Sequence, residues 1–134
     1  MQTLINQLKF YLSQVGVELL EDNNLPLPNK FAYLTINNIT YFDNKLNYEM
    51  TLNIVFLDVN FTEDYVYNLI KYLAIVIEKV FETKTLTFGF TNEPGEDGSL
   101  FNLLSCTFIY IDFMETNKMV FSYDDYLNEL KQGL

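Results

Sequence analysis

The sequence predicts an α+β fold, in which an antiparallel sheet of about four strands in two hairpins carries two main helices on one face. Three observations predict it. Apolar and polar residues alternate over 46–57, apolar residues recur every three or four positions over 62–81, and turn-forming residues interrupt the chain at 43–45 and 91–98. The predicted order is α-β-β-α-β-β with a short last helix. Because the 134 residues contain no linker or repeat, we expect residues 1–134 to form a single α+β domain.

The first predicted element is a helix over residues 4–20. Its apolar residues recur at spacings of three and four, which places them on one face: Leu4, Leu8, Tyr11, Leu12, Val15 and Leu19. Gly16 lowers the helix propensity by roughly 1 kcal/mol relative to alanine. Pro26 and Pro28 then require an extended connection, since proline disfavours helical geometry in the residue before it.

A hairpin is predicted next, from strands over 31–42 and 46–57. The first strand is rich in β-branched and aromatic residues, and the second shows the clearest alternation in the chain. Asp43, Asn44 and Lys45 supply the turn, because Asp and Asn tolerate turn dihedrals.

The second predicted helix covers 62–81. Thr62 is a good N-cap, and Glu63 and Asp64 place negative charge at the positive end of the helix dipole. One apolar stripe contains Val66, Ile70, Leu73, Ile77 and Val80, and further apolar residues widen it: Tyr65, Tyr72, Ile75 and Val76. Such a helix is either deeply buried or in contact with something on a second side.

The second hairpin is predicted from strands over 84–90 and 100–114, joined by the loop 91–98. The strand 100–114 is apolar on both faces, with Leu104, Cys106 and Phe108 on one and Leu103, Ile109 and Ile111 on the other. The two helices cover only one of these faces, so the C-terminal segment or a neighbouring subunit must cover the other. Ser122 is a candidate cap for the short last helix, whose apolar side contains Tyr126, Leu127 and Leu130.

The composition argues against an enzyme and provides no catalytic, cofactor-binding or metal-binding residues. The chain has no histidine, one cysteine and no glycine-rich phosphate loop, which excludes imidazole bases, thiolate metal clusters and nucleotide loops of known type. Cys106 is expected to be a small buried apolar residue. Glu93, Glu96 and Asp97 cluster in the loop 91–98, where they form a solvated tip, a protein-docking loop or a cation site.

The net charge of -10, with no arginine, argues against nucleic-acid binding. The same negative charge is compatible with a surface that DNA passes without binding to it. The N-terminus lacks the continuous apolar stretch of a signal peptide, and the longest apolar run is too short to cross a bilayer, so we expect cytosolic synthesis without membrane association.

Protein binding is therefore the predicted activity. Tyrosine is enriched at protein interfaces, and Tyr65 and Tyr72 lie one heptad apart beside the main stripe of the second helix, where either a core or an intersubunit position is possible. The predicted interface residues are Tyr65, Tyr72, Glu93, Glu96, Asp97, Leu103, Ile109 and Ile111.

The element order resembles that of the phage tail terminator proteins, also called tail-to-head joining proteins. The resemblance rests on the helix 4–20, the sequence LPLP at 25–28, the hairpin 31–57, the capped helix 62–81 and the two strands around TNEPGEDG. It does not require the segment 115–134. It implies a homo-oligomeric ring, usually a hexamer, that caps the tail tube, contacts the head connector and lets DNA pass without specific binding. Such a protein is found in the host cytoplasm during assembly and then in the virion.

Two alternatives remain open from the sequence. A small acidic inhibitor or immunity-type protein would use its negative charge to cover a basic protein surface. A structural domain of a larger bacterial complex would assemble with other proteins away from DNA.

Overall fold

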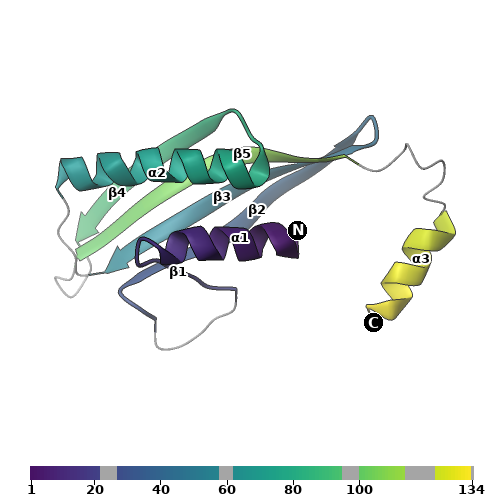
Figure 1. Cartoon of the computed structure of the whole chain (residues 1–134), viewed down its shortest axis with the longest axis horizontal. Helices are drawn as coiled ribbons and strands as arrows, with labels where there is room; N and C mark the ends of the chain where they lie inside the picture. The colour runs from purple at the N-terminus through teal and green to yellow at the C-terminus, as the bar shows by residue number, and fades with distance from the viewer. Residues whose placement is uncertain (22–26, 58–61, 95–99, 114–122, 134) are drawn as a thin grey trace.

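The computed structural model covers the whole chain and describes residues 1–21, 27–57, 62–94, 100–113 and 123–133. It confirms an α+β fold (Figure 1). The elements, in chain order, are α1 (Gln2–Ser13), β1 (Glu18–Leu19), β2 (Lys30–Phe42), β3 (Lys45–Leu57), α2 (Glu63–Phe81), β4 (Leu86–Pro94), β5 (Leu100–Phe113) and α3 (Tyr123–Gln132).

The strands form one five-stranded sheet in the order β1-β2-β3-β5-β4. The two predicted hairpins are present, and they meet at the centre of the sheet, where β3 pairs antiparallel with β5 from Lys45↔Phe113 to Leu57↔Phe101. The prediction of about four purely antiparallel strands was wrong in one respect, because β1 adds a short parallel pair with β2. The sheet is therefore mixed.

Helices α1 and α2 lie on the same face of the sheet, as predicted (Figure 1). Between them and the sheet lies the core, to which Leu8 and Leu12 contribute from α1, Leu73 and Ile77 from α2, and alternate residues from the central strands. In β3 these alternate residues are Met50, Leu52, Ile54 and Phe56, all at most 1% exposed. The alternation seen in the sequence thus marks the helix-covered face correctly.

The prediction of one helix over 4–20 was wrong after Ser13. Gly16 adopts a φ of +76°, which helical backbone does not permit, and the chain turns there with the Val17 amide donating to the Leu12 carbonyl oxygen at 3.0 Å. Val17 and Leu19, two positions apart, are then buried in an extended segment. Leu19 fitted the helical spacing by coincidence, since its burial comes from pairing opposite Ala32.

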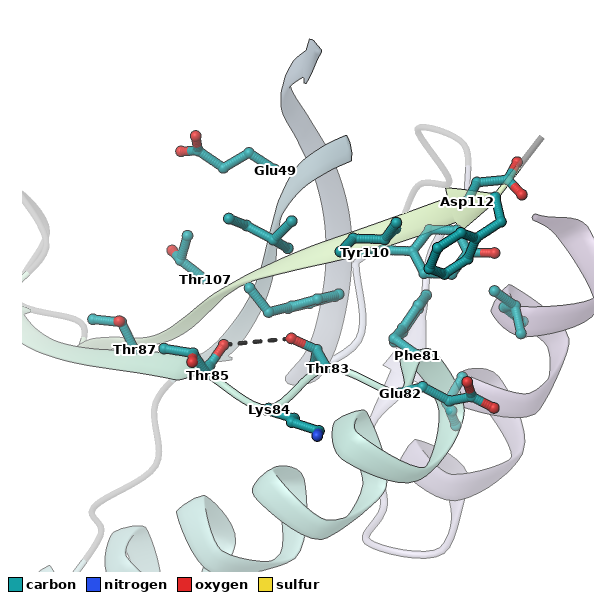
Figure 2. A pocket seen from close by; sticks show the side chains of 16 residues that line it. Glu49, Phe81, Glu82, Thr83, Lys84, Thr85, Thr87, Thr107, Tyr110 and Asp112 are labelled. Carbon is teal, nitrogen blue, oxygen red and sulfur yellow. Dashed lines mark hydrogen bonds between the residues drawn. The ribbon is translucent and has the colours of Figure 1, made fainter. Parts of the chain in front are cut away.

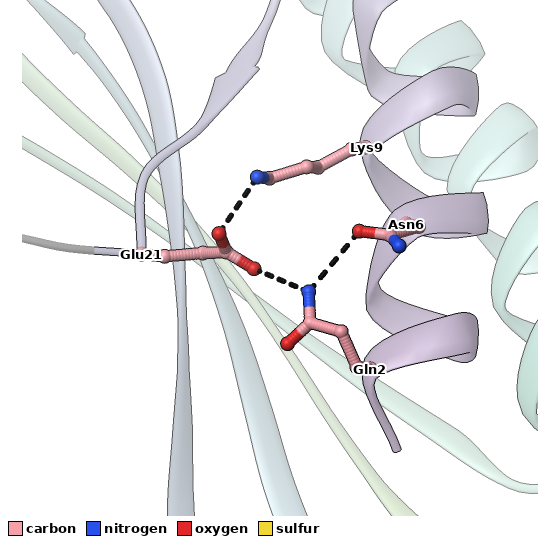
Figure 3. Close-up of polar contacts among 4 residues, drawn as sticks. All are labelled: Gln2, Asn6, Lys9 and Glu21. Atoms are coloured by element: carbon pink, nitrogen blue, oxygen red, sulfur yellow. Dashed lines mark hydrogen bonds and ion pairs between the residues drawn. The ribbon is translucent and has the colours of Figure 1, made fainter.

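A polar cluster on the surface connects the end of this segment to α1 (Figure 3). The Glu21 carboxylate accepts hydrogen bonds from Lys9 Nζ at 2.8 Å and from Gln2 Nε2 at 2.9 Å, and Gln2 also donates to Asn6. The hydrogen bond from Lys9, followed by that from Gln2, lowers the pKa of Glu21. These contacts orient α1 relative to the chain that follows β1.

The predicted turn of the first hairpin and the predicted cap of α2 are confirmed, whereas Ser122, the candidate cap of the last helix, lies outside the described residues. Asp43 and Asn44 have φ angles of 52° and 59°, as a two-residue type I′ hairpin turn requires, and Phe42 pairs with Lys45. Helix α2 begins after Thr62, whose side chain accepts a hydrogen bond from the Tyr65 amide at 3.2 Å. It ends at Glu82, which is left-handed with a φ of 55°.

The second hairpin differs from its predicted bounds. Strand β4 starts at Leu86 and continues through Pro94, so 91–94 belong to a strand and not to the predicted loop 91–98. The register explains the extension, because β5 provides partners from Phe108 back to Leu100 along this whole length. Residues 95–99 lie outside the described part of the chain.

A candidate protein interface

The face of the sheet that is turned away from α1 and α2 is here called the open face. Its centre is polar. Thr51 and Thr107 lie opposite each other with their hydroxyl oxygens 3.2 Å apart, and the Asn37 side chain donates to Thr51 Oγ1 at 2.7 Å. A centre of this composition is stable in water and needs no covering partner.

One end of the sheet projects beyond the ends of both α1 and α2, as Figure 1 shows at the β2–β3 turn. We call this three-stranded projection the β-arm and define it as residues 36–42 of β2, 45–49 of β3 and 109–113 of β5. The end of α2 reaches only its base, where Phe81 packs on Tyr110 with ring centres 5.7 Å apart. The side chains nearer the β2–β3 turn lack the cover that the helices give to the rest of the sheet.

The β-arm exposes apolar side chains on both faces. The register places Ile39 and Tyr41 on the helix side, level with Tyr48 and Leu46 of β3. Seven large apolar side chains of the arm are between 42% and 70% exposed: Ile36, Ile39, Tyr41, Phe42, Ile109, Ile111 and Phe113.

Phe42, Ile109, Ile111 and Phe113 form a cluster on the open face of the arm. Phe42, Lys45 and Phe113 share one cross-strand row, with Lys45 Nζ 5.3 Å from the centre of the Phe113 ring, and Ile109 and Ile111 follow along β5. At ~150–200 Å² per side chain, the seven residues together expose roughly 600–800 Å². This area is divided between the two faces of the arm. The four side chains on the open face account for roughly 340–460 Å² of it, which is within the range of about 300–600 Å² for the largest apolar patch of a typical monomer, a patch that is often functional.

A groove of about 860 Å³ lies where the β-arm meets the end of α2 (Figure 2). One side is β5 from Thr107 to Phe113, and the other is the end of α2 with the connection Thr83–Thr85. Pairing between β4 and β5 ends at Leu86↔Phe108, whereas β5 continues to pair with β3 up to Phe113. The groove therefore follows a stretch of β5 that has a described strand neighbour on one side only.

The groove is lined by apolar side chains, by threonines and by a few charges. Phe81 forms its inner wall and packs on Phe108 with ring centres 4.9 Å apart. Glu49, Glu82 and Asp112 are its acids and Lys84 is its base. Burial, followed by the nearby Asp112, raises the pKa of Tyr110 above its usual value. Such a lining fits an extended polypeptide, which offers apolar side chains and main-chain hydrogen bonds.

The structure divides the predicted interface residues into separate places. Ile109 and Ile111 lie in the β-arm, whereas Leu103 lies half-buried at the opposite end of the open face. Glu93 lies in β4 opposite Phe101, and Glu96 and Asp97 lie outside the described residues.

Tyr65 and Tyr72 are engaged within the subunit. Tyr65 packs edge-to-face on Phe56 with ring centres 6.4 Å apart, and the Tyr72 hydroxyl donates to the Tyr11 carbonyl oxygen at 2.7 Å. These contacts favour the core position for both tyrosines. The exposed apolar residues of α2 are instead Tyr67 and Ile75, on the side of the helix turned away from the sheet.

Sequence reasoning missed the β2 side of the arm, namely Ile36, Ile39, Tyr41 and Phe42. The available signal was that large apolar residues occupy both alternating sets of positions near the end of this strand. In a strand next to a turn, that pattern indicates apolar side chains on both faces.

The chain matches no protein-family model, and no curated protein resembles it significantly. Within the described ranges, no helix combines the length and the apolar character needed to cross a membrane. The described residues also contain no group of three or more carboxylate or thiol side chains arranged to hold a metal ion.

Proposed function

We propose that this protein is a structural virion subunit, a tail terminator or neck component that acts by assembling with copies of itself. The observation that carries the proposal is the β-arm, which exposes roughly 600–800 Å² of apolar side chain at the end of an otherwise well-packed subunit. A standard interface buries about 800 Å² per partner, so the two faces of the arm together approach that area and the open face alone supplies about half of it.

In this proposal the copies form a ring, a hexamer in the usual form of this class, that caps the tail tube and joins it to the head connector. The net charge of -10 and the absence of arginine support a position beside DNA, because a wall of like charge repels the phosphate backbone and lets it slide. The protein would assemble in the host cytoplasm and remain in the tail or neck of the virion.

The experiment is size-exclusion chromatography with multi-angle light scattering over a wide concentration range, followed by negative-stain imaging with and without tail tubes. Ring-shaped particles of several copies, or rings seated on tube ends, are the expected result. A strictly monomeric protein that forms no ring on tail tubes would overturn the proposal. A monomer that binds a basic protein, and loses that binding steeply with salt, would point to the acidic inhibitor.

A further inference from the structure

Among the described residues, two strands have an outer edge that is largely unpaired: β2 beyond the short β1, and β4 on the other side of the sheet. β1 pairs with β2 only at Phe31 and Ala32, and Leu20 extends this contact by one hydrogen bond to Ala32, so among the described residues the outer edge of β2 is open from 34 to 42. On the other side, β4 is the last strand of the sheet. Both edges present main-chain donors and acceptors.

Among the described residues, neither edge carries, over most of its length, the charged residues or proline that commonly protect exposed strand edges. Charged residues, especially lysine, and proline normally block edge strands from pairing with other chains. Residues 34–42 of β2 contain neither, and neither do residues 86–92 of β4, before Glu93 and Pro94 end that stretch. One bulge between Ile36 and Asn38 interrupts β2, and the pairing is regular again beyond it.

We propose that these two edges form the two halves of one contact between copies, in which β2 of one copy pairs antiparallel with β4 of the next. This inference rests on the proposed ring. Its occupant is a second copy of this chain, because each copy carries one edge of each kind and the arm, which includes the end of β2, exposes apolar side chains whose area over both faces approaches the ~800 Å² per partner of a standard interface. Head-to-tail contacts of this type close into a ring when the rotation from copy to copy completes a full turn, and otherwise they form open filaments.

The strand directions agree with such a ring. Neighbours in a six-membered ring are related by a rotation of roughly 60°, so a strand that runs approximately along the ring axis keeps its direction from one copy to the next. Within the subunit, β2–β3, β3–β5 and β5–β4 are all antiparallel, so β2 and β4 run in opposite directions. Pairing β2 of one copy with β4 of its neighbour therefore produces an antiparallel ladder and keeps the open faces on the same side.

The groove beside β5 also fits this arrangement. The free edge of β2 is longer than the uncharged stretch of β4, and its last residues belong to the arm. An added β2 strand that starts along β4 continues past Leu86, where the groove begins, so its Tyr41 and Phe42 come to lie beside the groove. The neighbour thereby covers apolar side chains of both arms.

Disulfide cross-linking between two different single substitutions tests the contact. Thr40→Cys marks β2 and Thr87→Cys marks β4, and both positions are exposed on the open face. We expect mild oxidation of the mixture to give a cross-linked dimer, while each variant alone stays uncross-linked. Thr91→Cys is a second β4 position, which captures a ladder displaced along the strand. The native Cys106 is buried, so the wild-type protein oxidised in the same way is the control and should give no cross-linked dimer.

Ile75→Cys on the outer side of α2 is the matched control and should not cross-link with Thr40→Cys. Cross-links of Thr40→Cys with itself would mean a two-fold contact and overturn the proposal. Light scattering on the same samples distinguishes a failure of the β2–β4 contact from a failure of the proposed ring. An oligomer without cross-links from β2 to β4 overturns the strand contact but not the ring, whereas these cross-links in an open chain of copies support the contact and overturn the ring.

Discussion

The hydroxyl of Tyr72 in α2 donates a hydrogen bond of 2.7 Å to the main-chain carbonyl oxygen of Tyr11 in α1. This contact joins the two helices that cover the sheet, between residues 61 positions apart in the chain. Both helices also contribute to one core, so the bond holds α1 in position over the β1–β2 side of the sheet.

Tyr72→Phe should therefore lower the free energy of unfolding by about 1 kcal/mol, the usual loss for one hydrogen bond, while leaving the oligomeric state unchanged. Chemical denaturation followed by circular dichroism measures the change. Tyr67→Phe is the matched control, because Tyr67 lies exposed on the same helix and its variant should unfold like the wild type. A changed oligomeric state in Tyr72→Phe would mean that Tyr72 contributes to the contact between copies, as the sequence allowed.

Alkaline pH should destabilise the fold. Burial raises the pKa of Tyr65 and Tyr72, and burial with the nearby Asp112 raises that of Tyr110. A group whose folded pKa is raised contributes stability that is complete below its unfolded pKa, near 10 for tyrosine, and that is lost as pH rises through the folded pKa. Denaturation midpoints should thus fall from about pH 10 upward. A constant midpoint up to pH 12 would contradict this.

The thiol of Cys106 should be inert in the native protein. It is 1% exposed, and burial raises its pKa to about 12, so almost no thiolate exists at pH 8. A chromogenic disulfide reagent should detect no thiol in the folded protein and one thiol per chain in guanidinium. Rapid labelling without denaturant would show that the strand around Cys106 opens readily.

The sequence predicted the elements whose signals are local. Thr62 as the cap of α2 and Asp43-Asn44 as the turn of the first hairpin act within a few residues, and both were placed correctly. β1 was missed because two residues cannot establish a period, and its strand geometry depends on Phe31 and Ala32, which are distant in sequence.

For the interface, Ile109 and Ile111 could be recognised because β5 is apolar on both faces. On the β2 side of the same surface, apolar residues at both alternating sets of positions were a signal, but whether Ile39 or Tyr41 is covered depends on where the helices end relative to the strands. That relation is set by the three-dimensional packing.

Gly16 should be required for its backbone conformation and not for space. Its φ is +76°, and an added Cβ would meet no atom within 4 Å. Gly16→Ala should therefore cost roughly 1–2 kcal/mol, the penalty for an L-residue in left-handed geometry. Gly16→Asn should cost less, since asparagine tolerates this region. Equal losses for the two variants in thermal unfolding would indicate a steric cause instead.

Charges placed on the β-arm should prevent assembly without unfolding the subunit. Ile39→Lys and Ile111→Lys replace exposed side chains, so the monomer loses little packing, but each puts a lysine on a surface that we propose is buried between copies. We expect both variants to remain monomeric in light scattering at concentrations where the wild type assembles, with unfolding midpoints close to that of a wild-type monomer. Ile75→Lys on α2 is the matched control and should assemble normally. If Ile39→Lys and Ile111→Lys assemble as the wild type does, the β-arm lies outside the contact, and the ring must be held together by another surface.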